Sequence, residues 1–590
     1  MCGINGFNFE DNKLIEKMNK LLNHRGPDSH DKFVDSNVSL GQTRLSIIDL
    51  SSAGSQPMPN EDESIWIVYN GEVYNFKELK KNLKGKHKFK SETDTEVIIH
   101  LYEEYGKEML PMLNGMFAFC LYDSNKKQLL LVRDRTGVKP LYYYFDGEKF
   151  IFSSEIKAIL AHGMPRNINK DSLAFYLTFG YTLGESLIDG IKELEPASYM
   201  IFDLEKKTIE QGKYWSLKEK EIKADINSIE DLLKDSVKRR VIADVPVGAY
   251  LSGGIDSSLI TALSRPYIDE YHTFSVGFDE GVYSELPFAK MVSEHLDTIH
   301  HEITVTAEDA IKNIEKIAWH YDDPIAEGGT IPNYFISKLA KKYVTVALAG
   351  EGGDEVFGGY RWYKYQPNIL NYSKYAPFPI PEIGKSFTRK KIRMLNSARN
   401  GIEDLQSITQ SWLSPTEIRD IYRFDYKDPK KLFKERSNSN FKSILNRMQY
   451  IDINTLLQSY NRKADRMTMA FAVEERVPFQ DYRLLEASFS LPENLRINGG
   501  NEKYVLKKIG QKYLPKETID REKRGYGVPI SHWIETLLKE DMENRLDSSL
   551  LVEDKIFRKD LRKKVKYHHN SYWGLYSLEI WYKNYIITQN

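Results

Sequence analysis

The sequence predicts an α+β domain over residues 2–205 and an α/β domain over residues 226–590, joined by a linker at 206–225. Three observations support this division. A chain of 590 residues exceeds what one hydrophobic core normally supports. Short strand-like runs dominate the first third of the chain, whereas strands and helices alternate from about residue 226. The segment between them, EKKTIEQGKYWSLKEKEIKAD, is polar and charged.

The elements of the first domain follow from apolar runs separated by Gly, Asn and Asp at turn positions. Strands are expected at 39–49, 64–74, 115–123, 127–134, 140–145 and 149–155. Helical spacing of apolar residues appears at 12–24 and 95–106. These elements predict strand-rich sheets covered by helices.

The second domain is predicted from strands that alternate with helices. Strands are expected at 245–251, 271–278, 298–303 and 344–350, and helices at 228–241, 257–264, 284–296, 308–320 and 334–343. This order is typical of βαβ units, which form a parallel sheet with helices on both faces. Residues from about 360 to 590 are predicted to be mostly helical additions.

The composition is that of an ordinary soluble globular protein. The chain is 41% hydrophobic and 28% charged, with a net charge of −1, so it shows no basic surface for nucleic acid. No apolar run reaches the roughly 18 residues that would indicate a membrane span. Glu10, Asp11 and Lys13 interrupt any signal-peptide pattern. Two cysteines indicate a reducing compartment, and a cytoplasmic location is expected.

Cys2 stands directly after the initiator methionine. If Met1 is removed, the α-amine of Cys2, with a pKa of about 7.7–8.0, lies beside its own thiol and can act as its base. The alternative is chance placement at a frayed terminus. Cys2 alone does not decide between the two.

The stretch AYLSGGIDSS at 249–258 predicts a phosphate-binding loop. A strand ends at Leu251, Ser252, Gly253 and Gly254 turn, and a helix begins near Asp256. Glycines let the backbone approach a ligand, and helix N-termini favour anions. Asp256 is a candidate Mg²⁺ ligand. The Walker lysine is absent, so this is not the common nucleotide loop. An incidental Gly-Gly turn is the alternative.

Several motifs together resemble one family, the glutamine-hydrolysing asparagine synthetases. SGGIDSS is similar to the pyrophosphate loop of N-type ATP pyrophosphatases, and LAGEGGDEVFGGY at 348–360 is similar to a loop of asparagine synthetases. ADRMTMAFAVEERVPFQD and KRGYGVPISHW resemble two later motifs. HRGPD, RLSIID, YNGE and SETDTEVI, between 24 and 98, resemble the N-terminal glutaminase. The resemblance implies an Ntn-hydrolase-like αββα sandwich followed by an adenine nucleotide alpha hydrolase-like domain.

The resemblance assigns roles in the first domain. Cys2 is the nucleophile, and the Asn70 side chain and Gly71 N–H form the oxyanion hole. Arg44 binds the α-carboxylate of glutamine, and Asp94 with Glu72 binds its α-amino group. Each has a structural alternative: Arg44 as a surface ion-pair residue, Asn70-Gly71 as a hairpin turn, and Asp94 as a helix N-cap. Cys120 is expected to be buried and inert.

The resemblance also assigns the second site. The pyrophosphate and Mg²⁺ would be held by Ser252, Gly253, Gly254, Asp256, Ser257 and Ser258, and the adenosine by Leu251, Val276, Ala349 and Gly350. Glu351 is the acid associated with intermediate formation and ammonia attack, and Asp354 is a second metal ligand. Lys463 or Arg466 would stabilise the departing pyrophosphate, unless one simply pairs with Asp465 or Glu474.

The implied reaction uses ATP as a substrate and Mg²⁺ as a cofactor. Ammonia released from glutamine at Cys2 passes inside the protein to β-aspartyl-AMP and gives asparagine. The sequence departs from the family at two places. Ala349 stands where serine is common, so a hydroxyl contact to the nucleotide is absent there; IAEGGT at 325–330 differs from the family's acceptor-binding stretch, so the identity of the carboxylate acceptor stays open. The alternatives are another carboxylate acceptor, such as a sugar acid or secondary metabolite, a sugar-phosphate isomerase or phosphoribosyl relative, and a non-catalytic sensor. Relatives are often dimers, so a homodimer is expected.

Overall fold

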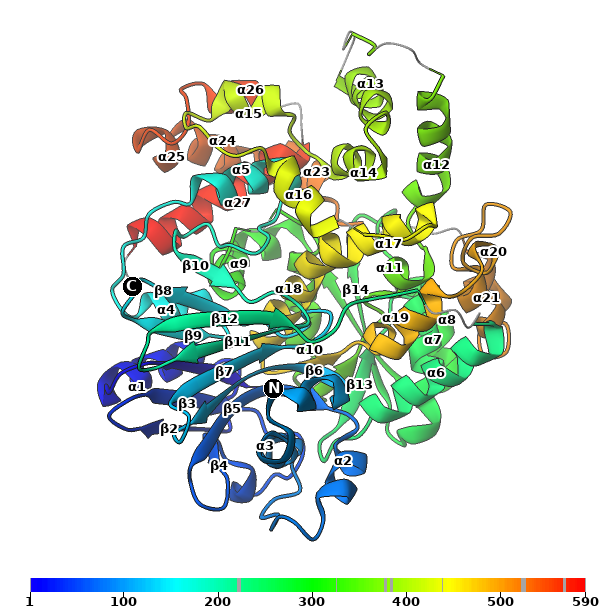
Figure 1. The fold of residues 1–590 in the computed structure, drawn as a ribbon. Helices are drawn as coiled ribbons and strands as arrows, with labels where there is room; N and C mark the ends of the chain where they lie inside the picture. Colours follow the sequence, from blue (N-terminus) through cyan, green and yellow to red (C-terminus); the bar gives the residue numbers. More distant parts are fainter. Residues whose placement is uncertain are drawn as a thin grey trace.

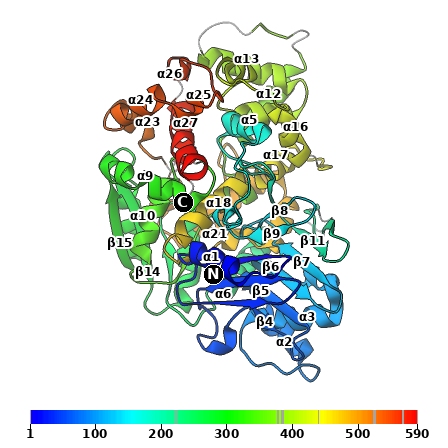
Figure 2. The ribbon, with the colours of Figure 1, turned by 90° about the vertical axis from the view of Figure 1, so that its left-hand side faces the viewer.

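The computed structural model describes residues 2–219, 224–324, 326–375, 379–381, 386–437, 439–521, 527–565 and 569–588. The N-terminal part is built on two six-stranded sheets stacked face to face, and the second part on a parallel sheet (Figure 1). Figure 2 shows these two parts side by side, with the C-terminal helices above them.

The first sheet has the strand order β10-β8-β9-β1-β3-β2, and neighbouring strands run antiparallel. Its strands are β1 (Gly3–Phe7), β2 (Ser29–Val34), β3 (Ser39–Arg44), β8 (Tyr142–Phe145), β9 (Phe150–Ser153) and β10 (Ile191–Glu193). The central place of β1 fixes the start of the chain inside the domain.

The second sheet has the order β12-β11-β7-β6-β5-β4, again antiparallel. Its strands are β4 (Met58–Pro59), β5 (Ile65–Val73), β6 (Gly115–Asp123), β7 (Gln128–Arg133), β11 (Ser198–Asp203) and β12 (Thr208–Lys213). The strand β12 lies within the segment expected to be the linker, so this sheet continues past residue 205.

The two sheets enclose an apolar layer and carry helices on their outer faces. Ile4 and Leu40 of the first sheet meet Val68 and Cys120 of the second in this layer. Helices α1 (Asn12–Leu22) and α4 (Ile156–Leu160) cover the first sheet, and α2 (Phe76–Leu83) and α3 (Asp94–Tyr105) cover the second. The αββα sandwich expected from the resemblance is therefore confirmed.

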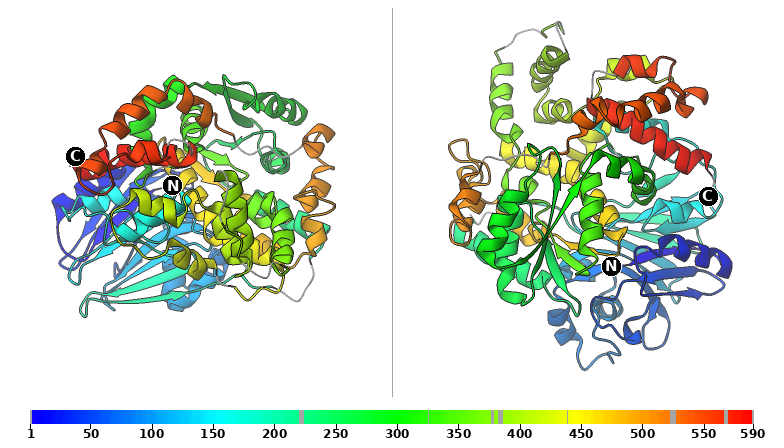
Figure 3. Two further views of the ribbon diagram at one scale, coloured as in Figure 1. Left: turned by 90° about the horizontal axis from the view of Figure 1, so that it is seen from above. Right: turned by 180° about the vertical axis from the view of Figure 1, so that it is seen from behind.

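The parallel sheet has the order β15-β14-β13-β16-β17. Its strands are β13 (Val247–Tyr250), β14 (His272–Phe278), β15 (Ile299–Val305), β16 (Val346–Leu348) and β17 (Glu474–Arg476). Helices α6 (Ile226–Arg240), α7 (Ile255–Ser264) and α8 (Leu286–Leu296) pack on one face, and α9 (Ala307–Tyr321) and α10 (Thr330–Ala340) on the other. The predicted α/β domain is confirmed, with helices on both sides of the sheet (Figure 3, right).

The remainder of the chain is mostly helical, as predicted. Its longer helices are α12 (Trp362–Ser373), α13 (Ser386–Ala398), α14 (Ile402–Gln410), α16 (Pro429–Ser437), α17 (Ile444–Asn454), α18 (Leu456–Met469), α19 (Tyr482–Phe489), α21 (Tyr504–Gly510), α24 (Lys539–Asp547) and α27 (His569–Tyr582). No helix in the described ranges has both the length and the apolar character needed to cross a membrane.

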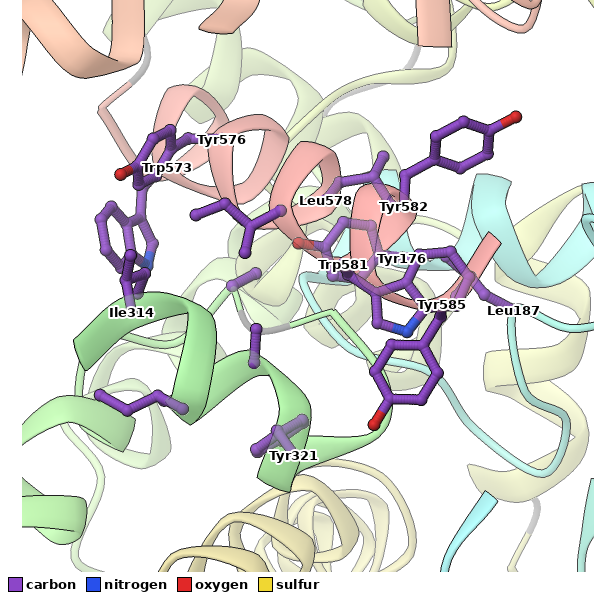
Figure 4. Close-up of a cluster of buried hydrophobic side chains, with 14 of the residues drawn as sticks. Tyr176, Leu187, Ile314, Tyr321, Trp573, Tyr576, Leu578, Trp581, Tyr582 and Tyr585 are labelled. Atoms are coloured by element: carbon purple, nitrogen blue, oxygen red, sulfur yellow. The ribbon is translucent and has the colours of Figure 1, made fainter. Parts of the chain in front are cut away.

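The last helix, α27, joins the two parts of the molecule. Its aromatic side chains face α9 of the second domain and α5 (Lys170–Phe179) near the end of the first (Figure 4). The Tyr176 hydroxyl of α5 donates to the Gly574 carbonyl at 2.7 Å, and Trp581 Nε1 donates to the Asp322 carbonyl at 2.6 Å. The C-terminal helix thus fixes the position of the two domains.

Candidate active sites

Cys2 lies inside the sandwich, directly before β1. It is 7% exposed, and its backbone N–H donates to Asn70 Oδ1 at 3.0 Å. Arg25 Nε donates to the Cys2 carbonyl at 3.2 Å. Burial raises the pKa of the Cys2 thiol, while a hydrogen bond from the Leu45 backbone and the charge of Arg44 act in the opposite direction. The alternative of chance placement at a frayed terminus is therefore excluded.

Asn70 and Gly71 lie in the middle of β5, opposite Ala118 and Phe117 of β6. The hairpin-turn alternative is excluded by this pairing. Asn70 Nδ2 is buried and has no hydrogen-bond partner among the described residues, so it is available as a donor beside the cysteine. A Cβ on Gly71 would lie 2.2 Å from the Met116 carbonyl oxygen, so only glycine fits there. A buried donor without a partner is the kind of group that an oxyanion hole uses.

Arg44 ends β3 and is buried rather than exposed. Its guanidinium donates to the carbonyls of Asp49 at 2.5 Å and Ser51 at 2.8 Å. The guanidinium is fixed in orientation by backbone oxygens. The burial of Arg44 therefore excludes the alternative that it is a surface ion-pair residue.

Asp94 is the first residue of α3, whereas Thr93 is the N-cap, so the N-cap alternative is wrong. Asp94 Oδ2 accepts from the Tyr69 hydroxyl at 2.6 Å and from the Val73 N–H at 2.7 Å. Burial raises the pKa of Asp94 to about 6, although both hydrogen bonds lower it.

Glu72 lies 3.2 Å from Arg476 Nη2, an arginine supplied by β17 of the second domain. Burial, followed by the charge of Glu474, raises the pKa of Glu72 well above its usual value. Arg476 also binds Glu474 through Nε at 2.6 Å. A residue of the second domain therefore reaches the predicted glutamine site.

The glycine loop of the second site follows β13, as predicted. Gly253 has φ +72°, and a Cβ there would lie 2.6 Å from the Ala289 nitrogen. The hydroxyls of Ser252 and Ser257 are 3.0 Å apart, and Gly254 caps α7 without a side-chain hydrogen bond to the helix. The loop therefore presents small groups and a helix N-terminus, which suits an anion.

A second loop follows β16, the strand beside β13. A Cβ on Gly350 would lie 2.9 Å from the Ser257 nitrogen, and one on Gly353 would lie 2.8 Å from Asp256 Oδ1. Ala349, Leu251 and Val276 are buried near these loops, at or close to the carboxyl ends of their strands. The loops meet where the strand order reverses, which is where open α/β sheets bind ligands.

Asp256 and Asp354, the two expected metal ligands, converge on Lys503. Lys503 Nζ contacts the Asp256 carboxylate and lies 2.6 Å from Asp354 Oδ1. Two carboxylates on neighbouring loops are suitable donors for Mg²⁺. Lys503 could not be identified from the sequence, because nothing local marks a lysine that lies 247 positions after Asp256.

Glu351 shares a hydrogen bond with Glu475, a buried residue that follows Glu474 on β17. Burial raises the pKa of both carboxyls, and the charge of Lys463 acts against this shift. Lys463 Nζ itself lies 3.1 Å from Glu327 Oε1, within the IAEGGT segment. The motif match did not reveal the Glu351–Glu475 pair. Ile325 of the IAEGGT segment and residues 523–526 of the KRGYG motif lie outside the described residues.

Arg466 occupies a different environment from Lys463, although both are on α18. The Arg466 guanidinium is fully buried, 3.2 Å from both Glu155 and Asp322 and 3.7 Å from Asp465. It belongs to a network between the domains. Lys463 is the cation beside Glu351.

The same network ties Cys2 to the second domain. Arg25 of HRGPD binds Asp465 of α18 through two hydrogen bonds of 2.8 and 3.0 Å, and it binds Glu155 at 2.8 Å. A separate apolar cluster contains residues of both domains: Tyr74, Met116, Val138, Ala349 and Val477. This cluster contains residues next to Glu72 at one site and next to Gly350 at the other, so apolar contacts connect the two sites.

The fold and the two sites define a class: glutamine amidotransferases fused to a domain that uses a nucleotide. The model of the glutamine amidotransferase domain matches residues 1–215, and that of asparagine synthase matches residues 228–583. The chain belongs to the asparagine synthase family.

The relatives cover nearly the whole chain. A glutamine-hydrolyzing asparagine synthetase of Bacillus subtilis is 35% identical over 93% of this chain and 90% of its own length. Asparagine synthetase B of Escherichia coli is 28% identical over 89% of this chain and 81% of its own. A protein of Gibberella zeae named amidase chry2 is 27% identical over 90% of each.

Proposed function

We propose that this chain makes asparagine from aspartate, with glutamine as the nitrogen donor and ATP as the activating substrate. The observation that carries the proposal is the burial of Cys2 beside Asn70, whose Nδ2 has no partner among the described residues, in a chain that also holds the glycine loop. In this proposal the sandwich is the glutaminase domain and the domain from residue 226 onward is the synthetase.

At the first site, the Cys2 sulfur attacks the side-chain amide carbon of glutamine. The negative charge that develops on the oxygen is stabilised by Asn70 Nδ2 and the Gly71 N–H, which cost no reorganisation because they are already in place. Arg44 binds the α-carboxylate, and Asp94 and Glu72 bind the α-ammonium. Ammonia leaves, and water then hydrolyses the thioester to glutamate.

At the second site, the β-carboxylate of aspartate attacks the α-phosphorus of ATP and pyrophosphate leaves. A carboxylate is a poor electrophile, and the resulting acyl-adenylate provides the leaving group that ammonia needs. Ser252, Gly253, Gly254, Ser257 and Ser258 bind the phosphates, and Leu251, Val276, Ala349 and Gly350 line the adenosine pocket. Asp256 and Asp354 would hold Mg²⁺, which supplies positive charge against the phosphates when bound.

Lys463 rather than Arg466 is the proposed cation for the departing pyrophosphate. Support comes from the position of Lys463 beside Glu351, whereas the charge of Arg466 is compensated by Glu155 and Asp322. Glu351, whose carboxyl shares a proton with Glu475, is the proposed acceptor of a proton from the attacking ammonia.

The acceptor is the part of the proposal that most needs a test. Glu327, which pairs with Lys463, lies in the IAEGGT segment that departs from the family. A different carboxylic acid as the acceptor of ammonia is therefore the second candidate function. The test supplies amide-labelled ¹⁵N-glutamine, ATP and a panel of carboxylic acids, and detects products by mass spectrometry. Labelled asparagine with equal AMP and pyrophosphate is expected; an amide of another acid alone would overturn the assignment of aspartate.

A further inference from the structure

A cluster of histidines and carboxylates lies on the glutaminase domain, outside both sites. Glu61, His87, His100 and Glu103 each present one ligand atom, and these four atoms lie within 4.8 Å of one another. Glu61 lies between β4 and β5, His87 in the loop after α2, and the other two on α3. Three chain segments therefore meet at one point.

The separations suit tetrahedral coordination. His87 Nδ1 lies 3.4 Å from Glu61 Oε1 and 3.6 Å from Glu103 Oε2, and His100 Nδ1 lies 3.6 Å from the other Glu61 oxygen, Oε2. Zinc bonds to nitrogen and oxygen of about 2.0–2.1 Å give a ligand–ligand separation of about 3.3–3.4 Å in a tetrahedron. The hydrogen bond of 2.7 Å between His100 Nδ1 and Glu103 Oε2 is shorter, and this separation would open by less than about 1 Å.

The outer nitrogens of both rings also face carboxylates. His87 Nε2 lies 3.3 Å from Glu104 Oε1, and His100 Nε2 lies 3.8 Å from Glu96 Oε1. Metal-binding histidines usually donate their second N–H to such a group, which fixes the tautomer. Both rings therefore direct Nδ1 inward and Nε2 toward a carboxylate, and neither Nε2 has a hydrogen-bond partner among the described residues.

The two carboxylate ligands are held in place as well. Asn60 Nδ2 donates to Glu103 Oε1 at 2.8 Å, and the Lys88 N–H donates to Glu61 Oε1 at 3.2 Å. The His100 side chain is 2% exposed and that of His87 10%, whereas that of Glu61 is 33% exposed and leaves a route from solvent. The imidazole rings of His87 and His100 are stacked, with centroids 4.3 Å apart.

We propose that Glu61, His87, His100 and Glu103 bind one divalent transition-metal ion, with Zn²⁺ as the preferred ion. Two imidazoles and two carboxylates in a closed tetrahedral set are a donor set that Zn²⁺ accepts. The ion is structural. It fixes the loop after α2 against α3, the helix whose first residue is Asp94.

The test measures metal in the untagged full-length chain after incubation with Zn²⁺ and gel filtration. We expect one Zn²⁺ per chain for the wild type and a loss of that equivalent in His87→Ala and in His100→Ala. His295→Ala is the matched control, because His295 lies on α8 and contacts the Tyr513 carbonyl far along the chain. A wild type without bound zinc, or a His87→Ala variant that keeps it, overturns the proposal.

Two further measurements separate the site from other binding. Co²⁺ in place of Zn²⁺ should give the visible bands of a four-coordinate ion without a thiolate charge-transfer band, and a thiolate band would assign the metal to Cys2 instead. Glu104→Gln should weaken zinc binding about 10–100-fold while leaving the four ligands in place. Zn²⁺ should raise the melting temperature of the wild type but not of His87→Ala; equal shifts in both proteins would contradict the site.

Discussion

Asn70→Ala is expected to stop glutamine use while sparing synthesis from free ammonia. The Nδ2 atom of Asn70 is buried and unpaired, so in the free protein its hydrogen bond is available for the reaction alone. Removing one donor of an oxyanion hole costs about 10²–10³ in kcat, or about 2.7–4 kcal/mol of transition-state stabilisation. We therefore expect glutaminase kcat to fall by that factor.

The same substitution removes the acceptor of the Cys2 N–H at 3.0 Å. A neutral hydrogen bond contributes about 0.5–1.5 kcal/mol to stability, so the variant should still fold. Glutamate release would be measured by a coupled assay, and ammonia-dependent asparagine synthesis in parallel. Asn114→Ala is the matched control, because Asn114 is also buried but donates to Asp481, away from Cys2. A glutaminase kcat within about fivefold of the wild type would refute this reasoning.

Substitutions at four other residues test the remaining parts of both sites and the interdomain network. Arg25→Met removes the arginine that binds both Asp465 and Glu155, so that Asp465 keeps only the longer 3.7 Å contact with Arg466 among the described residues; it should lower the free energy of unfolding by about 3–5 kcal/mol in urea denaturation, and a loss below about 1 kcal/mol would contradict the buried network. Because the raised pKa of Asp94 means that its carboxylate is lost as pH falls through about 6, glutaminase kcat/KM should decline below that pH, and Asp94→Asn should remove that titration. Lys503→Met should reduce ATP-dependent pyrophosphate release at least tenfold while glutaminase activity is kept; equal loss of both would show that the lysine only supports folding. Glu475→Gln keeps a hydrogen-bond donor to Glu351 and should retain most synthetase activity, whereas Glu475→Ala should not; similar rates in both would exclude that role.

Local patterns predicted the main elements because they repeat over many residues. The apolar run at 64–74 became β5, and the alternation after residue 226 became the parallel sheet. The glycine loop was predictable because its turn and helix start are contiguous in sequence. The three-residue strand β17 was not, since it is too short to show a period.

Residues that act through distant partners were not identified from the sequence. Arg25 and Asp465 are 440 positions apart, and a buried ion pair leaves no mark in either local sequence. The pairing of Glu351 with Glu475 likewise depends on adjacent strands from distant segments. Burial of charge is a property of tertiary packing, so the interdomain network could be described only from the structure.

The buried ion pairs between the domains limit which domain could replace either of them. Arg25 of the first domain binds Asp465 of the second, and Arg466 of the second binds Glu155 of the first. Both arginine side chains are 0% exposed. Grafting a foreign domain onto the second half would leave these desolvated charges facing residues that do not pair with them. A replacement domain must therefore supply matching acids and bases at these positions, and a chimera without them should not associate stably.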